Sequence, residues 1–249
     1  KQIWLWDGRE ARPFTHGPAD ARPRWSADGS RLAFLRATGE EGRPPQVAVL
    51  DAAGGEAAVI TAFALGATEA EWSPDGRRLA VIGVEWAGEW AGLDDEERKR
   101  HPRRLTRAGF RFDDLGWRHD RRSNAYLVDP AGGAPAALSA GDYHDSGLAW
   151  RPDGGAVAVL SARHEQRGLD GATQAWEVPA GGGDLRSLVA PGSWHSVSYR
   201  PDGMVFLIGH PDVWDYPAVA GLWRLEGGTP VAVAADLDRS FAPPAPAVL

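Results

Sequence analysis

The sequence predicts an all-β fold, namely a β-propeller built from four-stranded antiparallel blades. Three observations carry this prediction. An aromatic residue that leads into an Asp-Gly turn occurs four times, at Trp25, Trp72, Trp150 and Tyr199, with separations of 47, 78 and 49 residues. An apolar run follows each of these turns. The 31 glycines and 19 prolines are scattered along the chain, which indicates many turns between short strands rather than long helices.

The spacing and chemistry of these turns fit a blade repeat. Two of the separations lie near the roughly 40–50 residues of a propeller blade, and the third is longer by the length of one insertion. Proline presets φ and glycine tolerates a positive φ, so Pro-Asp-Gly favours a tight turn. The aspartate of each turn is expected to accept backbone N–H bonds, which is a structural role. These aspartates are Asp28, Asp75, Asp153 and Asp202.

Each repeat is predicted to contain four strands. The first precedes the aromatic residue, as at 67–72 and 193–199. The runs after the turns are almost continuously apolar, which predicts strands buried on both faces between stacked blades. These runs cover 32–35, 79–82, 157–160 and 205–208. A third strand leads into a Gly-rich hairpin turn, and a short polar strand completes the blade. The third strands cover 46–51, 124–129, 175–178 and 222–225.

The repeat also predicts where the blades begin and end. Four complete blades are expected, over 17–61, 62–138, 139–189 and 190–233. Part-blades are expected at both ends, over 1–15 and 234–249. A propeller that cannot close leaves exposed strand edges, which stable proteins avoid. We therefore expect the chain to be a fragment of a larger ring, or to be completed by partner segments.

The second blade contains the extra residues, as an insertion over 85–115. The charged run 94–100 places acidic before basic residues and is compatible with a helix. A basic stretch follows, and it consists of Arg103, Arg104, Arg107, Arg111, Arg118, Arg121 and Arg122. One interpretation is a solvated surface excursion held by ion pairs. A second is a loop at the mouth of the ring that steers an acidic or carboxylate-bearing ligand. Nucleic-acid binding is a third and weaker one, because the surrounding chain is acidic and no reader motif accompanies the stretch.

Six residues of this region are the candidate substrate-access residues. They are Glu85, Glu89, Arg103, Arg104, Arg107 and Arg111. The two glutamates bracket Trp86, and Trp90 follows, so this cluster could hold a cationic ligand or simply pack.

No catalytic, metal or cofactor site is predicted. The sequence lacks Gly-x-Ser-x-Gly, a phosphate-binding loop, a dinucleotide fingerprint and His-Glu-x-x-His, and it contains no cysteine. His144, Asp145 and Ser146 are sequence neighbours, whereas triad residues converge from separate loops. We expect these three residues to lead into the strand that ends at Trp150. His195 and His210 are isolated and are expected at strand ends or turns.

The composition limits the classes of partner that this protein is expected to bind. The net charge of −7 and a pI of about 5.5 argue against a nucleic-acid partner. No run of about 18 apolar residues predicts a membrane span. The absence of cysteine and of a recognisable signal peptide favours a cytoplasmic location. The composition neither favours nor excludes formation of a homo-oligomer.

Residues 72–81, which read Trp-Ser-Pro-Asp-Gly-Arg-Arg-Leu-Ala-Val, resemble the WD40-like or TolB-type propeller repeat. One group that uses this repeat is the prolyl oligopeptidase family (S9) of serine peptidases. The acylaminoacyl-peptidase and oligopeptidase branch is the more similar one. That resemblance rests on the insertion, on 104–105 and 110–113 within it, and on 120–129 and 142–145 after it.

The resemblance implies a seven- or eight-bladed propeller that covers an α/β-hydrolase domain carrying the catalytic triad. This chain would then be the non-catalytic, substrate-gating portion of a serine peptidase that hydrolyses acylated or short peptides. The hydrolase domain and the later blades are not in this sequence, so no catalytic residue is transferred. One alternative is a TolB-like propeller that serves as a protein–protein interaction module. A weaker one is a propeller enzyme, such as a lyase, with a metal or His/carboxylate site on the axis.

Overall fold

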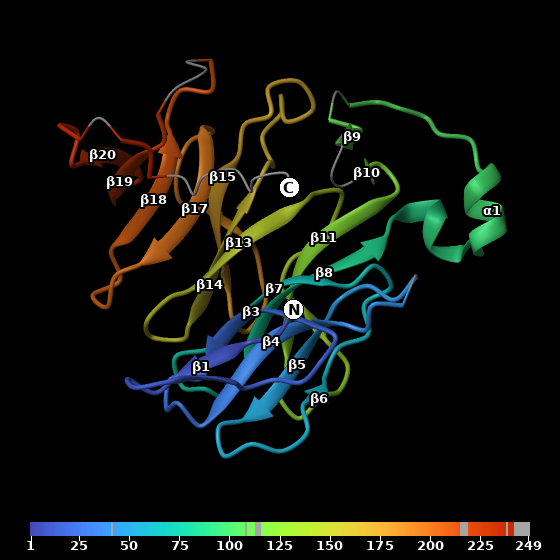
Figure 1. Cartoon of the computed structure of the whole chain (residues 1–249). Coiled ribbons are helices and arrows are strands. Elements are labelled where there is room, and N and C mark those ends of the chain that lie inside the picture. The colour runs from blue at the N-terminus through green and yellow to red at the C-terminus, as the bar shows by residue number, and fades with distance from the viewer. Residues whose placement is uncertain (41, 108, 113–115, 215–218, 238, 242–249) are drawn as a thin grey trace.

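The computed structural model describes residues 1–40, 42–107, 109–112, 116–214, 219–237 and 239–241. The described residues form four antiparallel sheets, one after another along the chain. Each has four strands, which pair in the order in which they occur in the sequence (Figure 1). This confirms the predicted fold class, a propeller architecture with four-stranded blades. The part-blade predicted over 234–249 lies mostly outside the described residues.

The four sheets are called blades 1 to 4. Blade 1 consists of β3 (Ala19–Trp25), β4 (Arg31–Ala37), β5 (Gln46–Asp51) and β6 (Ala58–Val59). Blade 2 consists of β7 (Ala67–Trp72), β8 (Leu79–Trp86), β11 (Arg121–Val128) and β12 (Ala136–Ala137). Blade 3 consists of β13 (Asp145–Trp150), β14 (Ala156–Ser161), β15 (Gln174–Pro179) and β16 (Arg186–Ser187). Blade 4 consists of β17 (Ser193–Tyr199), β18 (Val205–His210), β19 (Gly221–Glu226) and β20 (Thr229–Val233).

Two smaller ribbons accompany the blades. β1 (Trp4–Trp6) pairs with β2 (Ala11–Pro13), and Ile3 and Phe14 beside this ribbon pack on the buried core of blade 1. β9 (Arg111–Phe112) pairs with β10 (Gly116–Trp117) between β8 and β11. None of the helices in the described part of the chain is long and apolar enough to cross a membrane.

The aspartates of the repeated turns have the predicted structural role. Each accepts a hydrogen bond from the backbone N–H two residues further on. The acceptors are Asp28, Asp75, Asp153 and Asp202, with N–O distances of 3.0, 3.0, 2.8 and 3.1 Å. The Ser26 hydroxyl and the Ser30 N–H hold the pKa of Asp28 at about 2. The turns are thus closed by charged acceptors that stay ionised at neutral pH.

The repeated tryptophans hold one blade against the next. Trp72 Nε1 donates to the Arg24 carbonyl of blade 1, and Trp150 Nε1 donates to the Glu71 carbonyl of blade 2, both at 3.0 Å. The two indoles are only 7% and 9% exposed. Trp25 of blade 1 is 43% exposed and packs on Phe14. A buried indole therefore both fills the space between two sheets and bonds to the neighbouring backbone.

Arginines add a second contact at the same interfaces. The Arg31 guanidinium of blade 1 lies 4.8 Å from the Trp72 ring, and Arg78 of blade 2 lies 5.6 Å from the Trp150 ring. The first strands of successive blades also lie against one another, β3 on β7, β7 on β13 and β13 on β17. This is the arrangement of innermost strands around a common axis.

Candidate functional site

The insertion leaves blade 2 after β8 and returns at β11. Its two ends are neighbours, because the Ala87 N–H donates to the Asp120 carbonyl at 2.9 Å. It contains the 3-10 helix η1 (Gly88–Gly92), the helix α1 (Asp95–Arg100) and the β9–β10 ribbon. Figure 1 shows α1 set apart from the sheets, on the side of the molecule opposite β17 to β20.

Helix α1 forms where the charged run predicted a helix. Asp94 caps its first turn by accepting from the Glu97 N–H at 2.8 Å, and the Glu97 carboxylate accepts from the Asp94 N–H at 2.9 Å. This capping box satisfies two backbone donors at once. Acidic residues in the first turn and basic ones in the last also oppose the helix dipole. No residue of α1 is buried, so local polar contacts determine its position more than apolar packing does.

Arginine–tryptophan stacks replace an apolar core in the rest of the insertion. The Arg103 guanidinium lies between two indoles, 4.9 Å from the Trp90 ring and 4.7 Å from the Trp117 ring. Arg111 lies 5.3 Å from the Trp117 ring. Arg103 and Arg111, two of the candidate access residues, therefore have a packing role in this structure.

In the aromatic–acid cluster around Trp86, arginines of the chain itself stack on the Trp86 ring. Arg98 lies 4.4 Å and Arg121 lies 5.3 Å from the Trp86 ring. Glu89 pairs with His101 at 3.1 Å. The hypothesis of a cationic ligand on this cluster therefore gains no support, because the chain's own arginines take the stacking positions.

A cavity of about 1510 Å³ separates the insertion from the ends of the blades. Four candidate access residues line it, namely Glu85, Glu89, Arg104 and Arg107, whereas Arg103 and Arg111 do not. The inner strands reach it through Thr68 of β7 and Ser146 of β13. The segment 167–173, between β14 and β15, forms the opposite wall. The structure thus brings most of the candidate residues to one hollow at the inner end of blades 2 and 3.

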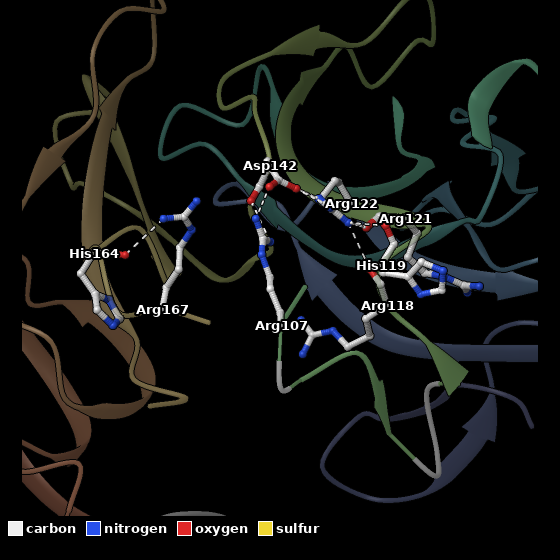
Figure 2. A network of polar contacts seen from close by, with 8 residues as sticks. All are labelled: Arg107, Arg118, His119, Arg121, Arg122, Asp142, His164 and Arg167. Carbon is white, nitrogen blue, oxygen red and sulfur yellow. Dashed lines mark hydrogen bonds and ion pairs between the residues drawn. The ribbon is translucent and has the colours of Figure 1, made fainter. Parts of the chain in front are cut away.

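Two arginines share one carboxylate in this cavity. Arg122 Nε donates to Asp142 Oδ1 at 2.6 Å, and Arg107 Nη1 donates to the Asp142 carbonyl at 3.3 Å. Arg107 and Arg122 each form an ion pair with the Asp142 side chain as well (Figure 2). Burial alone would raise the pKa of Asp142, but the two guanidinium groups outweigh it and lower that pKa. Asp142 therefore remains a carboxylate held between two cations.

Arg122 is fixed in place by the backbone. Its Nη1 donates to the carbonyls of Arg118 and His119 at 3.1 and 3.2 Å, and also to the Arg121 carbonyl. With Nε and Nη2 directed to Asp142, all three of its nitrogens are engaged. Arg122 is thus a rigid support, and it positions Asp142 relative to Arg107.

His144 lies close to the arginines of this wall. Burial lowers its pKa to about 3, and the charges of Arg118, Arg122 and Arg107 contribute to that shift, against an opposing hydrogen bond to the backbone of Arg118. Burial and the charge of Arg122 likewise lower the pKa of Arg118. The imidazole is therefore neutral at physiological pH and leaves the cationic character of this wall unchanged.

The neighbours His144, Asp145 and Ser146 do not form a triad. Asp145 instead pairs with Arg163 at 2.8 Å and accepts a hydrogen bond from the Ser139 hydroxyl. Ser139 in turn accepts from the Ala125 N–H at 2.8 Å, which ties blade 2 to blade 3. This confirms the expectation that these residues lead into the strand that ends at Trp150. The described residues contain no group of three or more histidines and carboxylates that could hold a metal ion.

Some residues of the cavity were not among the candidates. They are Asp142, His144 and Arg167, and they come from loops outside the insertion. Arg118 and Arg122 belong to the basic stretch but were not selected. Residues 142–145 were singled out only through the family resemblance. Nothing in the sequence indicates that Asp142 contacts Arg107, which lies 35 residues earlier in the chain.

No protein-family model matches this sequence. In sequence, it is 29% identical over 159 residues to the uncharacterized peptidase YuxL of Bacillus subtilis, which covers 61% of this chain and 24% of that protein. The chain therefore spans about a quarter of the length of this curated relative.

Solved structures show the same fold. An acylaminoacyl peptidase from Pyrococcus horikoshii matches with a TM-score of 0.67 and 18% identity, over 95% of this chain and 35% of that one. TolB from Acinetobacter baumannii matches with a TM-score of 0.57 and 18% identity, over 91% of this chain and 46% of that one. The sequence relative and the acylaminoacyl peptidase confirm the predicted resemblance to the propeller domains of S9-type peptidases.

Proposed function

We propose that this chain is the substrate-gating propeller portion of a serine peptidase. In this proposal the catalytic serine lies in an α/β-hydrolase domain of the same protein, and the propeller admits short or acylated peptides to it. The chain contributes no catalytic residue. A cytoplasmic location, favoured by the cysteine-free sequence, is part of the proposal.

The cavity at the inner end of blades 2 and 3 is the observation that carries this function. Its volume of about 1510 Å³ exceeds the roughly 300–1,000 Å³ of a typical small-molecule pocket, so a short peptide would fit there. A folded domain would not. The insertion forms one wall, and the two residues where it leaves and rejoins the blade, Ala87 and Asp120, are hydrogen-bonded to each other. A wall that is anchored in this way can differ in shape without disturbing the sheets behind it.

A fluorophosphonate probe, which labels activated serines, tests the peptidase assignment. The full-length protein that contains this chain should be labelled, on a serine of a Gly-x-Ser-x-Gly motif outside it. The chain expressed by itself should show no labelling and no hydrolysis of acyl-amino-acid or peptide esters. Labelling of any serine in this chain would contradict the non-catalytic role. A full-length protein that stays unlabelled would contradict the peptidase assignment.

A propeller that binds other proteins is the second candidate, and the structural similarity to TolB favours it. The same experiment separates the two functions, because an interaction module has no activated serine to label. An unlabelled full-length protein that forms a stable complex with another protein would favour this candidate.

A further inference from the structure

We propose that the open edge of β1 and the exposed face of Trp25 bind two further strands of the same protein, which come from outside residues 1–249 and complete a blade. The first of these strands would lie against Trp25, and the second would pair with β1. This interface is independent of the proposed function, because it would exist whether or not the protein is a peptidase.

The β1–β2 ribbon has the hydrogen bonds of the outer half of a blade. In blades 1 and 2, a backbone N–H of the third strand donates to a hydroxyl side chain just after the fourth strand. The donor and acceptor pairs are Val47 with Thr61 at 2.9 Å, and Ala125 with Ser139 at 2.8 Å. The Ile3 N–H donates to Thr15 Oγ1 in the same way, at 3.1 Å. β1 and β2 therefore correspond to the third and fourth strands of a blade.

The edge of β1 that faces away from β2 is unpaired. In the described part of the chain β1 pairs with β2 alone, whereas the third strand of each blade pairs on both edges. The Phe14 N–H donates to the Ile3 carbonyl at 2.8 Å, so the backbone groups of Ile3 face β2. Successive residues of a strand present their backbone groups to opposite edges, so those of Trp4 and Trp6 face the open edge. Such an edge is a template for another strand.

The side chains of Trp4 and Trp6 are exposed where a complete blade has buried residues. Counted from the shared N–H bond to a hydroxyl, these two residues correspond to Ala48 and Leu50 of β5. Ala48 and Leu50 are 0% and 4% exposed, and apolar residues of β4 lie opposite them. Trp4 and Trp6 are 59% and 69% exposed. Because clustered exposed apolar side chains mark interaction sites, we expect an apolar strand to cover both indoles.

Trp25 lacks the contact that its counterparts in blades 2 and 3 make. The indole N–H groups of Trp72 and Trp150 donate to carbonyls on the first strand of the preceding blade. These carbonyls belong to Arg24 and Glu71, each of which directly precedes the aromatic residue of its own repeat. Trp25 is far more exposed than its counterparts, and no described residue accepts a hydrogen bond from its Nε1. The strand that lies on Trp25 should therefore present the carbonyl that directly precedes an aromatic residue.

These equivalences specify the chemistry of the two missing strands. The first should end in Trp or Tyr and lead into an Asp-Gly turn, and the second should be a short apolar run. A second copy of this chain could not supply them without unfolding a blade, because its own second strands already pair on both edges. Strands of the same polypeptide also have the highest effective concentration.

Photocrosslinking in the full-length protein tests which segment covers β1. p-Benzoylphenylalanine in place of Trp6 keeps an aromatic side chain at the interface and reacts with neighbouring C–H bonds on illumination. We expect a crosslink within one molecule, to a peptide outside residues 1–249 that contains the aromatic residue with its Asp-Gly turn, or the apolar run after it. The same replacement at Trp214, which is 74% exposed, should give no crosslink to that peptide. A crosslink to a second copy, to another protein or to a segment without this repeat would overturn the proposal.

Hydrogen exchange of the unmodified full-length protein tests the pairing of β1, and it decides the case if no crosslink forms. The N–H groups of Trp4 and Trp6 should exchange at least about tenfold more slowly than that of Ala11, which faces the outer edge of β2. Equally rapid exchange of all three would overturn the proposal.

Oxidative footprinting of the same protein tests the contact at Trp25. The Trp25 side chain should be oxidised as slowly as that of Trp72, and at least about tenfold more slowly than that of the exposed Trp214. Oxidation of Trp25 at the rate of Trp214 would overturn this part of the interface.

Discussion

The blades and the insertion of this protein are held together by different forces. Strands β8 and β14 are buried over most of their length, and every residue of β14 is buried between its neighbouring sheets. Among the described residues, the insertion has no comparable apolar core. Guanidinium groups stacked on indoles, a capping box and ion pairs hold it instead. The repeated blades are therefore a rigid frame, whereas the insertion determines the charge and shape of the cavity wall.

This difference has an energetic consequence. Burying apolar surface stabilises a protein by about 25 cal/mol per Å², and it involves many residues at once. A cation–π contact contributes only about 0.5–2 kcal/mol, depending on burial. Changes in a blade should therefore affect the whole chain, and changes in the insertion should remain local.

The largest effect is expected from removing an indole between two blades. Trp150→Ala should lower the free energy of unfolding by roughly 3–5 kcal/mol, because it leaves a cavity and breaks the bond to the Glu71 carbonyl. Trp72→Ala should have an effect of the same size. Urea denaturation provides the measurement.

Trp214→Ala is the matched control, because Trp214 is 74% exposed and its loss should change little. A loss below 1 kcal/mol for Trp150→Ala would show that the repeated tryptophans do not hold the blades together, and the contrast with the insertion would disappear.

A smaller effect is expected from breaking the central stack of the insertion. Arg103→Ala should cost about 1–2 kcal/mol locally, because the side chain leaves two indole rings and its pairing with Asp120. Hydrogen exchange should speed up between Ala87 and Asp120, while exchange in the blades stays unchanged.

Arg111→Ala serves as the comparison for this variant, because Arg111 is exposed and, among the described residues, stacks on the Trp117 ring alone. Faster exchange throughout blades 2 and 3 in Arg103→Ala would contradict the separation of the two regions.

The same contrast explains what the sequence could and could not predict. The blades follow from local chemistry, because a buried strand needs an apolar run and a tight turn needs Asp and Gly. Trp72, Asp75 and the strand after them can therefore be recognised within a single repeat. The helix α1 is also local, because Asp94 and Glu97 cap it three residues apart.

The cavity depends on contacts between distant parts of the chain. Arg103 and Arg104 are adjacent and equally basic in the sequence, but only Arg104 lines the cavity, while Arg103 packs between two tryptophans. The pairing of Arg107 with Asp142 joins the insertion to the loop before blade 3. Residue type alone cannot distinguish a packed arginine from one that faces a cavity, because both positions favour the same side chain.

In the proposed function, the insertion rather than the blades selects which peptides enter the cavity. Replacing residues 88–119 of the full-length protein by an Asn-Gly turn tests it most directly, because Ala87 and Asp120 are already hydrogen-bonded neighbours. The free energy of unfolding of the blades should change by less than about 1 kcal/mol. Hydrolysis of long, unfolded polypeptides should rise relative to that of short peptides. Blades that no longer fold, or a size preference that remains unchanged, would contradict a selective role of the insertion.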